Sequence, residues 1–154
     1  MTKASEKVLD LLKQDKIQNW RSLMRAFEGV YHGLECSLSK EGLSISRFQI
    51  MFYLYTEEYM APVDLARKML VSRANISTFL KRMMADDLVM ECPKSKSLKR
   101  PCYRLTKKGK NFFEELFPRY CSRVDKLMIS FSENTVADLK KLTLHTSQIE
   151  VSRL

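Results

Sequence analysis

The sequence contains little glycine, proline and histidine. Only four glycines and four prolines occur among 154 residues, which predicts long helices joined by few loops. No apolar run approaches the roughly 20 residues that a membrane-spanning helix needs. The N-terminal segment MTKASEKVLDLLKQDK has neither the apolar core nor the small-residue cleavage site of a signal peptide. We therefore expect a cytoplasmic chain, about one domain in size, that has no membrane partner.

Groups that could carry metal or catalytic chemistry are also scarce. Cys36, Cys92, Cys102 and Cys121 lie far apart without a CxxC motif, which favours free thiols over disulfides or a structural zinc site. Two histidines provide too few ligands for a zinc sensor. The sequence has no glycine-rich phosphate loop and no motif that groups a nucleophile, a base and an orienting acid. These absences indicate that the protein binds no metal and no cofactor and is not an enzyme.

The positive charge is concentrated in the middle third of the chain. Residues 61–110 contain 13 basic and 4 acidic side chains, a difference of +9, which equals the net charge of the whole chain. A basic block between neutral arms is typical of a surface that binds a polyanion. The alternative is a chance cluster of surface lysines.

Apolar residues recur at helical spacing through much of the chain. Gly29 and Gly33 weaken the first helix near its end or let another backbone come close. In ISRFQI, Ser46 and Gln49 form a capping box at the start of the second helix. The helices predicted before the middle of the chain span residues 5–36, 47–57 and 62–70.

The stretch VSRANISTFLKR, residues 71–82, predicts a helix whose two faces differ. Ser72 is a natural N-cap. Small, polar and basic side chains form one face, which must look outward because the opposite face is apolar. The apolar face, at spacing i, i+3, i+4, i+7 and i+8, consists of Ile76, Phe79, Leu80, Met83 and Met84.

Two short extended runs, VMECP and PCYRLT, follow Leu88 on either side of the basic tip KSKSLKR. They predict a β-hairpin with its prolines at a sheet edge. From Thr106 a long helix is expected to run to Phe131 with a kink at Pro118. Ser132 then caps a last helix.

A short helix, a tight turn, a second helix with a polar outer face and a basic hairpin follow the order of a winged helix-turn-helix. The expected fold class is therefore mainly α with a small β-hairpin wing. Arg73 can pair with guanine, Asn75 with adenine, and Ala74 or Thr78 with a thymine methyl, whereas the wing suits phosphates. A charged solvent-facing helix is the alternative. The residues expected to contact DNA are Ser72, Arg73, Ala74, Asn75, Ser77, Thr78, Lys81, Arg82, Lys94, Lys96, Lys99 and Arg100.

The chain resembles the multiple-antibiotic-resistance regulator (MarR) family of winged-helix transcription regulators. The resemblance is carried by LSISRFQIMFYL (43–54), DLARKMLVSRANISTFLKRMMADDLV (64–89) and YRLTKKGK (103–110). It implies a homodimer in which the two recognition helices, one from each copy, read a palindrome. It also implies that a ligand or an oxidant often lowers DNA affinity. Ser97 and Lys99 stand where family wings usually have an aspartate and an arginine, so we expect loose phosphate contacts from this wing.

The terminal helices have apolar stripes that a small winged domain cannot bury. We expect residues 1–36 and 111–154 to form a helical dimerisation region around a DNA-binding region at 43–110, with a monomeric helical bundle as the alternative. The residues expected at the dimer interface are Val8, Leu11, Leu12, Phe117, Tyr120, Leu127, Phe131, Leu139, Leu142 and Ile149.

Two regulatory sites are also candidates. Cys92 and Cys102 lie on opposite arms of the wing, among basic residues that could lower a thiol pKa, although idle thiols are the alternative. A small aromatic or lipophilic effector could enter between the first helix, the second helix and the helix after the wing. The same side chains would also serve as core. They are Trp20, Phe27, Tyr31, Phe48, Met51, Phe52, Tyr55 and Phe112.

The sequence therefore predicts a sequence-specific DNA-binding transcription regulator. It is expected to be a repressor that acts as a homodimer on a pseudo-palindromic operator. Two alternatives stay open: an architectural protein that coats duplex DNA without sequence choice, and an adaptor that uses the winged fold to bind a protein partner.

Overall fold

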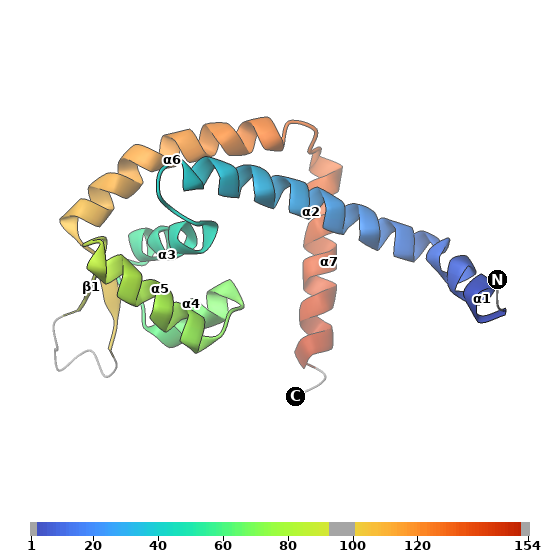
Figure 1. Cartoon of the computed structure of the whole chain (residues 1–154), viewed down its shortest axis with the longest axis horizontal. Helices are drawn as coiled ribbons and strands as arrows, with labels where there is room; N and C mark the ends of the chain where they lie inside the picture. The colour runs from blue at the N-terminus through green and yellow to red at the C-terminus, as the bar shows by residue number, and fades with distance from the viewer. Residues whose placement is uncertain (1–2, 93–100, 152–154) are drawn as a thin grey trace.

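The structure is a computed structural model that describes residues 3–92 and 101–151 (Figure 1). Over these residues the chain forms a winged-helix unit from which long helices extend. Its elements are α1 (Lys3–Leu12), α2 (Asp15–Ser39), α3 (Ile45–Thr56), α4 (Pro62–Met69), α5 (Arg73–Ala85), β1 (Val89–Glu91), β2 (Tyr103–Leu105), α6 (Lys107–Leu127) and α7 (Glu133–Val151). The expected fold class, mainly α with a small hairpin, is confirmed.

The N-terminal region consists of two helices, so the prediction of one helix over residues 5–36 was wrong. The break lies before α2, where Gln14 has an extended backbone (φ −60°, ψ 136°). Gln14 is nevertheless the N-cap of α2, and its carbonyl accepts from the amides of Ile17 and Gln18 at 3.0 Å. Helix α2 continues through both glycines. A Cβ at Gly33 would lie 3.0 Å from the Leu127 side chain, so this glycine lets α6 approach closely.

Helix α3 begins two residues earlier than predicted, and its N-cap is Ser44 rather than Ser46. The Ser44 hydroxyl accepts from the Arg47 amide at 3.4 Å. The first amide of the helix, at Ile45, donates to Glu35 of α2 at 2.8 Å. The stretch LSIS contains two serines that could cap the helix. The earlier start is accompanied by a contact with Glu35, which is ten residues away from Ile45 in the sequence.

The apolar core lies where α3, α4, α5 and the hairpin meet, under the N-terminal half of α6. Ile50, Met51, Leu65, Ile76 and Met83 are completely enclosed. The predicted apolar face of α5 is buried at Ile76, Leu80 and Met83 and half-buried at Phe79. Met84 is exposed, contrary to expectation, because it lies in the last turn of α5, beyond the edge of the core.

The hairpin arms pair as predicted. Strands β1 and β2 are antiparallel, with Val89 opposite Leu105 and Glu91 opposite Tyr103. Tyr103 also exchanges backbone hydrogen bonds with Met60 in front of α4, which ties the wing to the helical core. The wing tip falls outside the described residues.

Helix α6 starts within one residue of the predicted position, and Thr106 is its N-cap, since the Thr106 hydroxyl accepts from the Gly109 amide at 2.9 Å. It continues through Pro118 as one curved helix (Figure 1). It ends at Leu127, earlier than predicted, and Phe131 therefore lies in the connection to α7. Ser132 caps α7 as expected, since its hydroxyl accepts from the Thr135 amide at 3.2 Å.

Candidate nucleic-acid interface

The outer face of α5 has the exposure that a recognition helix needs. Ser72 caps the helix by accepting from the Asn75 amide at 3.2 Å. The apolar side of α5 holds the helix to the core, so the polar side points away from the protein. Every candidate DNA-contacting residue of this segment is exposed: Ser72, Arg73, Ala74, Asn75, Ser77, Thr78, Lys81 and Arg82.

Two of these side chains have their orientation set by local hydrogen bonds. The Thr78 hydroxyl donates to the Ala74 carbonyl at 3.0 Å. This bond occupies the hydroxyl and leaves the threonine methyl as the group that can meet a thymine methyl. The Ser72 hydroxyl oxygen accepts the capping hydrogen bond from the Asn75 amide, so the hydroxyl proton remains available for a phosphate oxygen.

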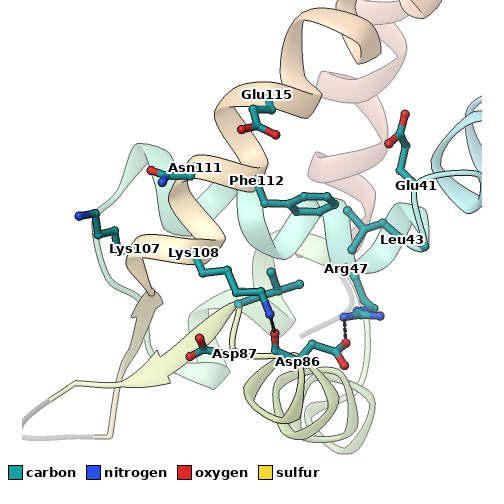
Figure 2. A pocket seen from close by; sticks show the side chains of 12 residues that line it. Glu41, Leu43, Arg47, Asp86, Asp87, Lys107, Lys108, Asn111, Phe112 and Glu115 are labelled. Atoms are coloured by element: carbon teal, nitrogen blue, oxygen red, sulfur yellow. Dashed lines mark hydrogen bonds and ion pairs between the residues drawn. The ribbon is translucent and has the colours of Figure 1, made fainter.

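The C-terminal end of α5 is attached to two other helices through Asp86. Its carboxylate forms an ion pair with Arg47 of α3, and its backbone carbonyl accepts from the Lys108 ammonium of α6 at 2.8 Å (Figure 2). These contacts were not predicted from the sequence. Nothing in the local pattern marks Arg47 or Lys108 as partners of a residue 39 or 22 positions away.

These contacts lie beside a hollow of about 880 Å³ between α3, the end of α5 and the start of α6 (Figure 2). Its walls carry both charge signs, and its apolar lining includes Leu43, Leu88 and Phe112. The hollow contains one of the predicted effector residues, Phe112. Its full lining is Glu41, Gly42, Leu43, Arg47, Asp86, Asp87, Leu88, Lys107, Lys108, Asn111, Phe112 and Glu115.

The other predicted effector residues fall into three groups. Phe48 and Met51 are buried in the core, and Phe48 stacks on Tyr120 with ring centroids 4.1 Å apart. Phe52 and Tyr55 are partly exposed beside the same aromatic stack, against Phe113. The three candidates on α2 are exposed in the single chain: Trp20, Phe27 and Tyr31.

A second hollow, of about 450 Å³, includes Tyr55, Arg104 and Lys110 in its lining. The Tyr55 hydroxyl donates to the Glu114 carboxylate at 2.9 Å. This hydrogen bond raises the pKa of Tyr55. Lys110 lies 5.8 Å from the centre of the Tyr55 ring, within range of a cation–π contact.

The wing cysteines face one another across the hairpin, but not as activated thiols. The Cys92 amide donates to the Cys102 carbonyl at 2.8 Å, and both thiols are free. Burial, followed by a hydrogen bond with Cys102, raises the pKa of Cys92 to about 12. The basic neighbour Arg104 lowers the pKa of Cys92, as expected, but its effect is smaller than these two effects, so the net shift is upward.

The basic residues of the wing tip, Lys94, Lys96, Lys99 and Arg100, lie outside the described residues, as does Ser97. Their contacts with DNA therefore stay a prediction. In the described part of the basic block, Arg104, Lys107, Lys108 and Lys110 are exposed around the start of α6.

The residues expected at a dimer interface are unequally covered in the single chain. Val8, Leu11, Leu12, Phe131 and Leu142 are exposed, whereas Leu127 and Leu139 are half-buried. Phe117 and Tyr120 are half-buried in the aromatic stack on Phe48. The Ile149 side chain is outside the described part of the chain. Among the described residues, no helix is both long and apolar enough to cross a membrane.

Comparison with known proteins matches this arrangement. Residues 46–128 match the family described as winged helix DNA-binding domain. The HTH-type transcriptional repressor YetL of Bacillus subtilis is 25% identical over 114 residues, which cover 73% of this chain and 68% of YetL.

Solved structures of MarR family proteins share the fold, and two of them illustrate the overlap with this chain. AbsC, a MarR family transcriptional regulator from Streptomyces coelicolor, superimposes with a TM-score of 0.80 and 23% identity over 90% of this chain and 97% of AbsC. A cysteine-to-serine mutant of MarR from E. coli, complexed with operator DNA, has a TM-score of 0.72 and 17% identity over 86% of this chain and 95% of that one. The chain thus belongs to the winged helix DNA-binding domain family and, with a MarR-type fold over most of its length, is a DNA-binding transcription regulator.

Proposed function

We propose that this protein is a cytoplasmic repressor that binds a pseudo-palindromic operator as a homodimer, one α5 helix in each half-site. The observation that carries the proposal is the division of α5, whose apolar side is buried at Ile76, Leu80 and Met83 while every polar candidate from Ser72 to Arg82 is exposed. Arg73 and Asn75 lie in the first turn, the part of a recognition helix that meets base edges.

The test is binding to the DNA upstream of its own gene, with excess random duplex and at two salt concentrations. Because phosphate contacts release counterions, we expect selective binding that falls by roughly 10³-fold or more between 50 and 200 mM salt. Equal affinity for every duplex would favour an architectural protein. No binding to any duplex would contradict the proposal and favour an adaptor for a protein partner.

The proposal of a homodimer rests on the uncovered apolar side chains of the long helices. Helix α1, the first half of α2 and α7 extend away from the winged-helix unit (Figure 1). Trp20 and Phe27 of α2 are 59% and 58% exposed in the single chain. Leaving such a surface in water is unfavourable, so a second copy that covers residues 1–36 and 111–154 is the proposed solution.

Sedimentation equilibrium tests this assembly. We expect a dimer for the native chain and a monomer, or a dimer at least tenfold weaker, for Leu11→Asp. The matched control is Tyr59→Asp, since Tyr59 is also exposed but lies between α3 and α4 in the winged-helix unit. A monomeric native chain, or equal weakening by both substitutions, would contradict the proposed interface.

We also propose that a small aromatic or lipophilic molecule relieves repression by binding beside the aromatic stack between α3 and α6. Phe52 supports this site, because its ring is partly exposed while it contacts Phe113 and Phe117. Benzoate and decanoate serve as probes. Either one should lower the operator affinity of the native chain. The decrease should be smaller for Phe52→Ala, and for the exposed control Tyr59→Ala it should be the same as for the native chain. An equal response of the native chain and Phe52→Ala would contradict this site.

A further inference from the structure

Leu70, in the turn between α4 and α5, combines two features that are unfavourable for a leucine. Its backbone is left-handed, with φ 54° and ψ 39°. Its side chain is 89% exposed, although it is large and apolar. Side chains with a Cβ are disfavoured in this conformation, and exposure to water gives a leucine no compensating burial.

The turn itself requires the backbone conformation but not the side chain. The Leu70 amide caps α4 by donating to the carbonyls of Ala66 and Arg67. The Val71 amide also returns to the Ala66 carbonyl, at 3.1 Å, which completes the reversal toward α5. Glycine would adopt this conformation without strain, and asparagine would do so more readily than leucine. The leucine side chain therefore has no evident part in making the turn.

The position of Leu70 connects it with the candidate nucleic-acid interface. Two residues later Ser72 caps α5, and Arg73 is exposed in the first turn of that helix. In a helix-turn-helix the first helix crosses the DNA backbone and the start of the second enters the major groove, which places the turn at the edge of that groove.

The charges around Leu70 also suit DNA. Arg67 and Lys68 occupy the last turn of α4 and are exposed. Arg67 contacts Asp64 at 3.4 Å, and Lys68 contacts Glu57 at 2.6 Å. Both are surface ion pairs that a phosphate could replace at little cost. An apolar side chain between these cations and Arg73 thus lies on a surface suited to the phosphates that border a groove.

We propose that Leu70 is a specificity-determining residue that packs on the C5-methyl group of a thymine at the edge of each half-site. The thymine methyl is the apolar group that the major groove presents. Covering it with Leu70 removes both apolar surfaces from water only when thymine is present. The inference rests on the proposed function and adds a base contact from outside α5.

The first experiment separates DNA binding from stability with two substitutions at this position. Leu70→Gly removes the side chain and the strain, so we expect an unchanged melting temperature or a rise of roughly 2–4 °C. Leu70→Ala removes the side chain and keeps the strain. Both variants are expected to bind the operator roughly three- to tenfold more weakly than the native chain. A variant that is as stable as the native chain but binds less well separates contact with DNA from a purely structural role.

The matched control is Tyr59→Ala. Tyr59 is 51% exposed and lies between α3 and α4, outside α5 and outside the proposed dimerisation region. This substitution is expected to leave operator affinity unchanged. Sedimentation of all three variants confirms that each has the oligomeric state of the native chain.

Operators that contain deoxyuridine identify the contacted group. Replacing each thymine of the half-site in turn by deoxyuridine removes only the methyl group. At the contacted position we expect the native chain to lose the same three- to tenfold and both Leu70 variants to lose nothing further.

The proposal is overturned if both variants bind the operator as tightly as the native chain. It is also overturned if the ratio of native to variant affinity is the same for every deoxyuridine-containing operator. Failure of the proposed function would look different, because the native chain itself would then not distinguish the operator from random duplex.

Discussion

Asp86 is bound by Arg47 of α3 through its carboxylate and by Lys108 of α6 through its backbone carbonyl. It is the C-cap residue of α5, so the far end of the recognition helix is fixed to two other helices at one residue. Arg47 is largely enclosed, with a side chain only 17% exposed, and its Nε finds no hydrogen-bond partner among the described residues. The orientation of α5 thus depends on α3 and on α6, the helix that leads to α7.

Removing the Asp86 carboxylate should destabilise the fold through Arg47. Asp86→Ala keeps the carbonyl for Lys108 but leaves an enclosed guanidinium without its carboxylate, which we expect to cost roughly 1–3 kcal/mol. The double variant Asp86→Ala with Arg47→Met should recover part of this loss, because it removes the charge as well. Urea unfolding measures both. A double variant whose loss equals the sum of the two single losses would show that the two side chains do not interact.

Gly109 should tolerate no side chain. A Cβ at this position would lie 2.0 Å from the Leu88 carbonyl oxygen, a backbone atom that cannot move aside. We expect Gly109→Ala to lower the free energy of unfolding by more than about 3 kcal/mol or to prevent folding. The matched control, Gly29→Ala in α2, has nothing within 4 Å, and should raise stability by roughly 0.5–1 kcal/mol. Thermal melts of the two variants within a few degrees of one another would contradict this difference.

Arg73 and Lys96 should have different roles on DNA. Arg73 is exposed in the first turn of α5, so Arg73→Ala is expected to cost roughly 1–3 kcal/mol on the operator and to change which operator is preferred. Lys96→Ala, at the wing tip, should weaken binding to all duplexes about equally. It should also reduce the slope of log affinity against log salt concentration by about one. Competition between specific and random duplexes measures both effects. The same factor lost by both variants on both duplexes would refute this division.

Cys92 should react slowly with alkylating agents at neutral pH. With a pKa raised to about 12, roughly one Cys92 in a hundred thousand is a thiolate at pH 7. Mass spectrometry with iodoacetamide should therefore show exposed Cys36 labelled first. The Cys92 rate should rise about tenfold per pH unit up to pH 10. Labelling of Cys92 before Cys36 at pH 7 would contradict the raised pKa.

The same pKa shift gives a direction for stability. Because folding raises the pKa of Cys92 from 9.0 to about 12, the folded state favours the protonated thiol. Its contribution to stability is complete below pH 9 and is lost as the pH rises from 9 to 12. Cys92→Ser should weaken this dependence in unfolding experiments between these pH values.

The residues fixed by short-range patterns were predictable. Ser72 and Ser132 each cap the helix that the sequence assigned to them, because a cap depends on amides only two or three residues away. The two faces of α5 were likewise visible from the spacing of Ile76 and Leu80. The choice between Ser44 and Ser46 was not, since the Ile45 amide is bound by Glu35 from another helix.

The sequence by itself determined the order of helices and hairpin, the concentration of charge in residues 61–110 and the polar face of α5, because helical periodicity and charge are local properties of the chain. Only the tertiary structure decided which residues hold and surround that face. Two of the features that it decided are contacts between residues distant in the sequence: the attachment of Asp86 to Arg47 and Lys108, and the approach of Leu88 to Gly109. The third, the raised pKa of Cys92, depends on burial. Leu70 lies between the two cases: its place in the turn is local, but its left-handed backbone and exposed side chain emerge only when α4 and α5 pack against the core.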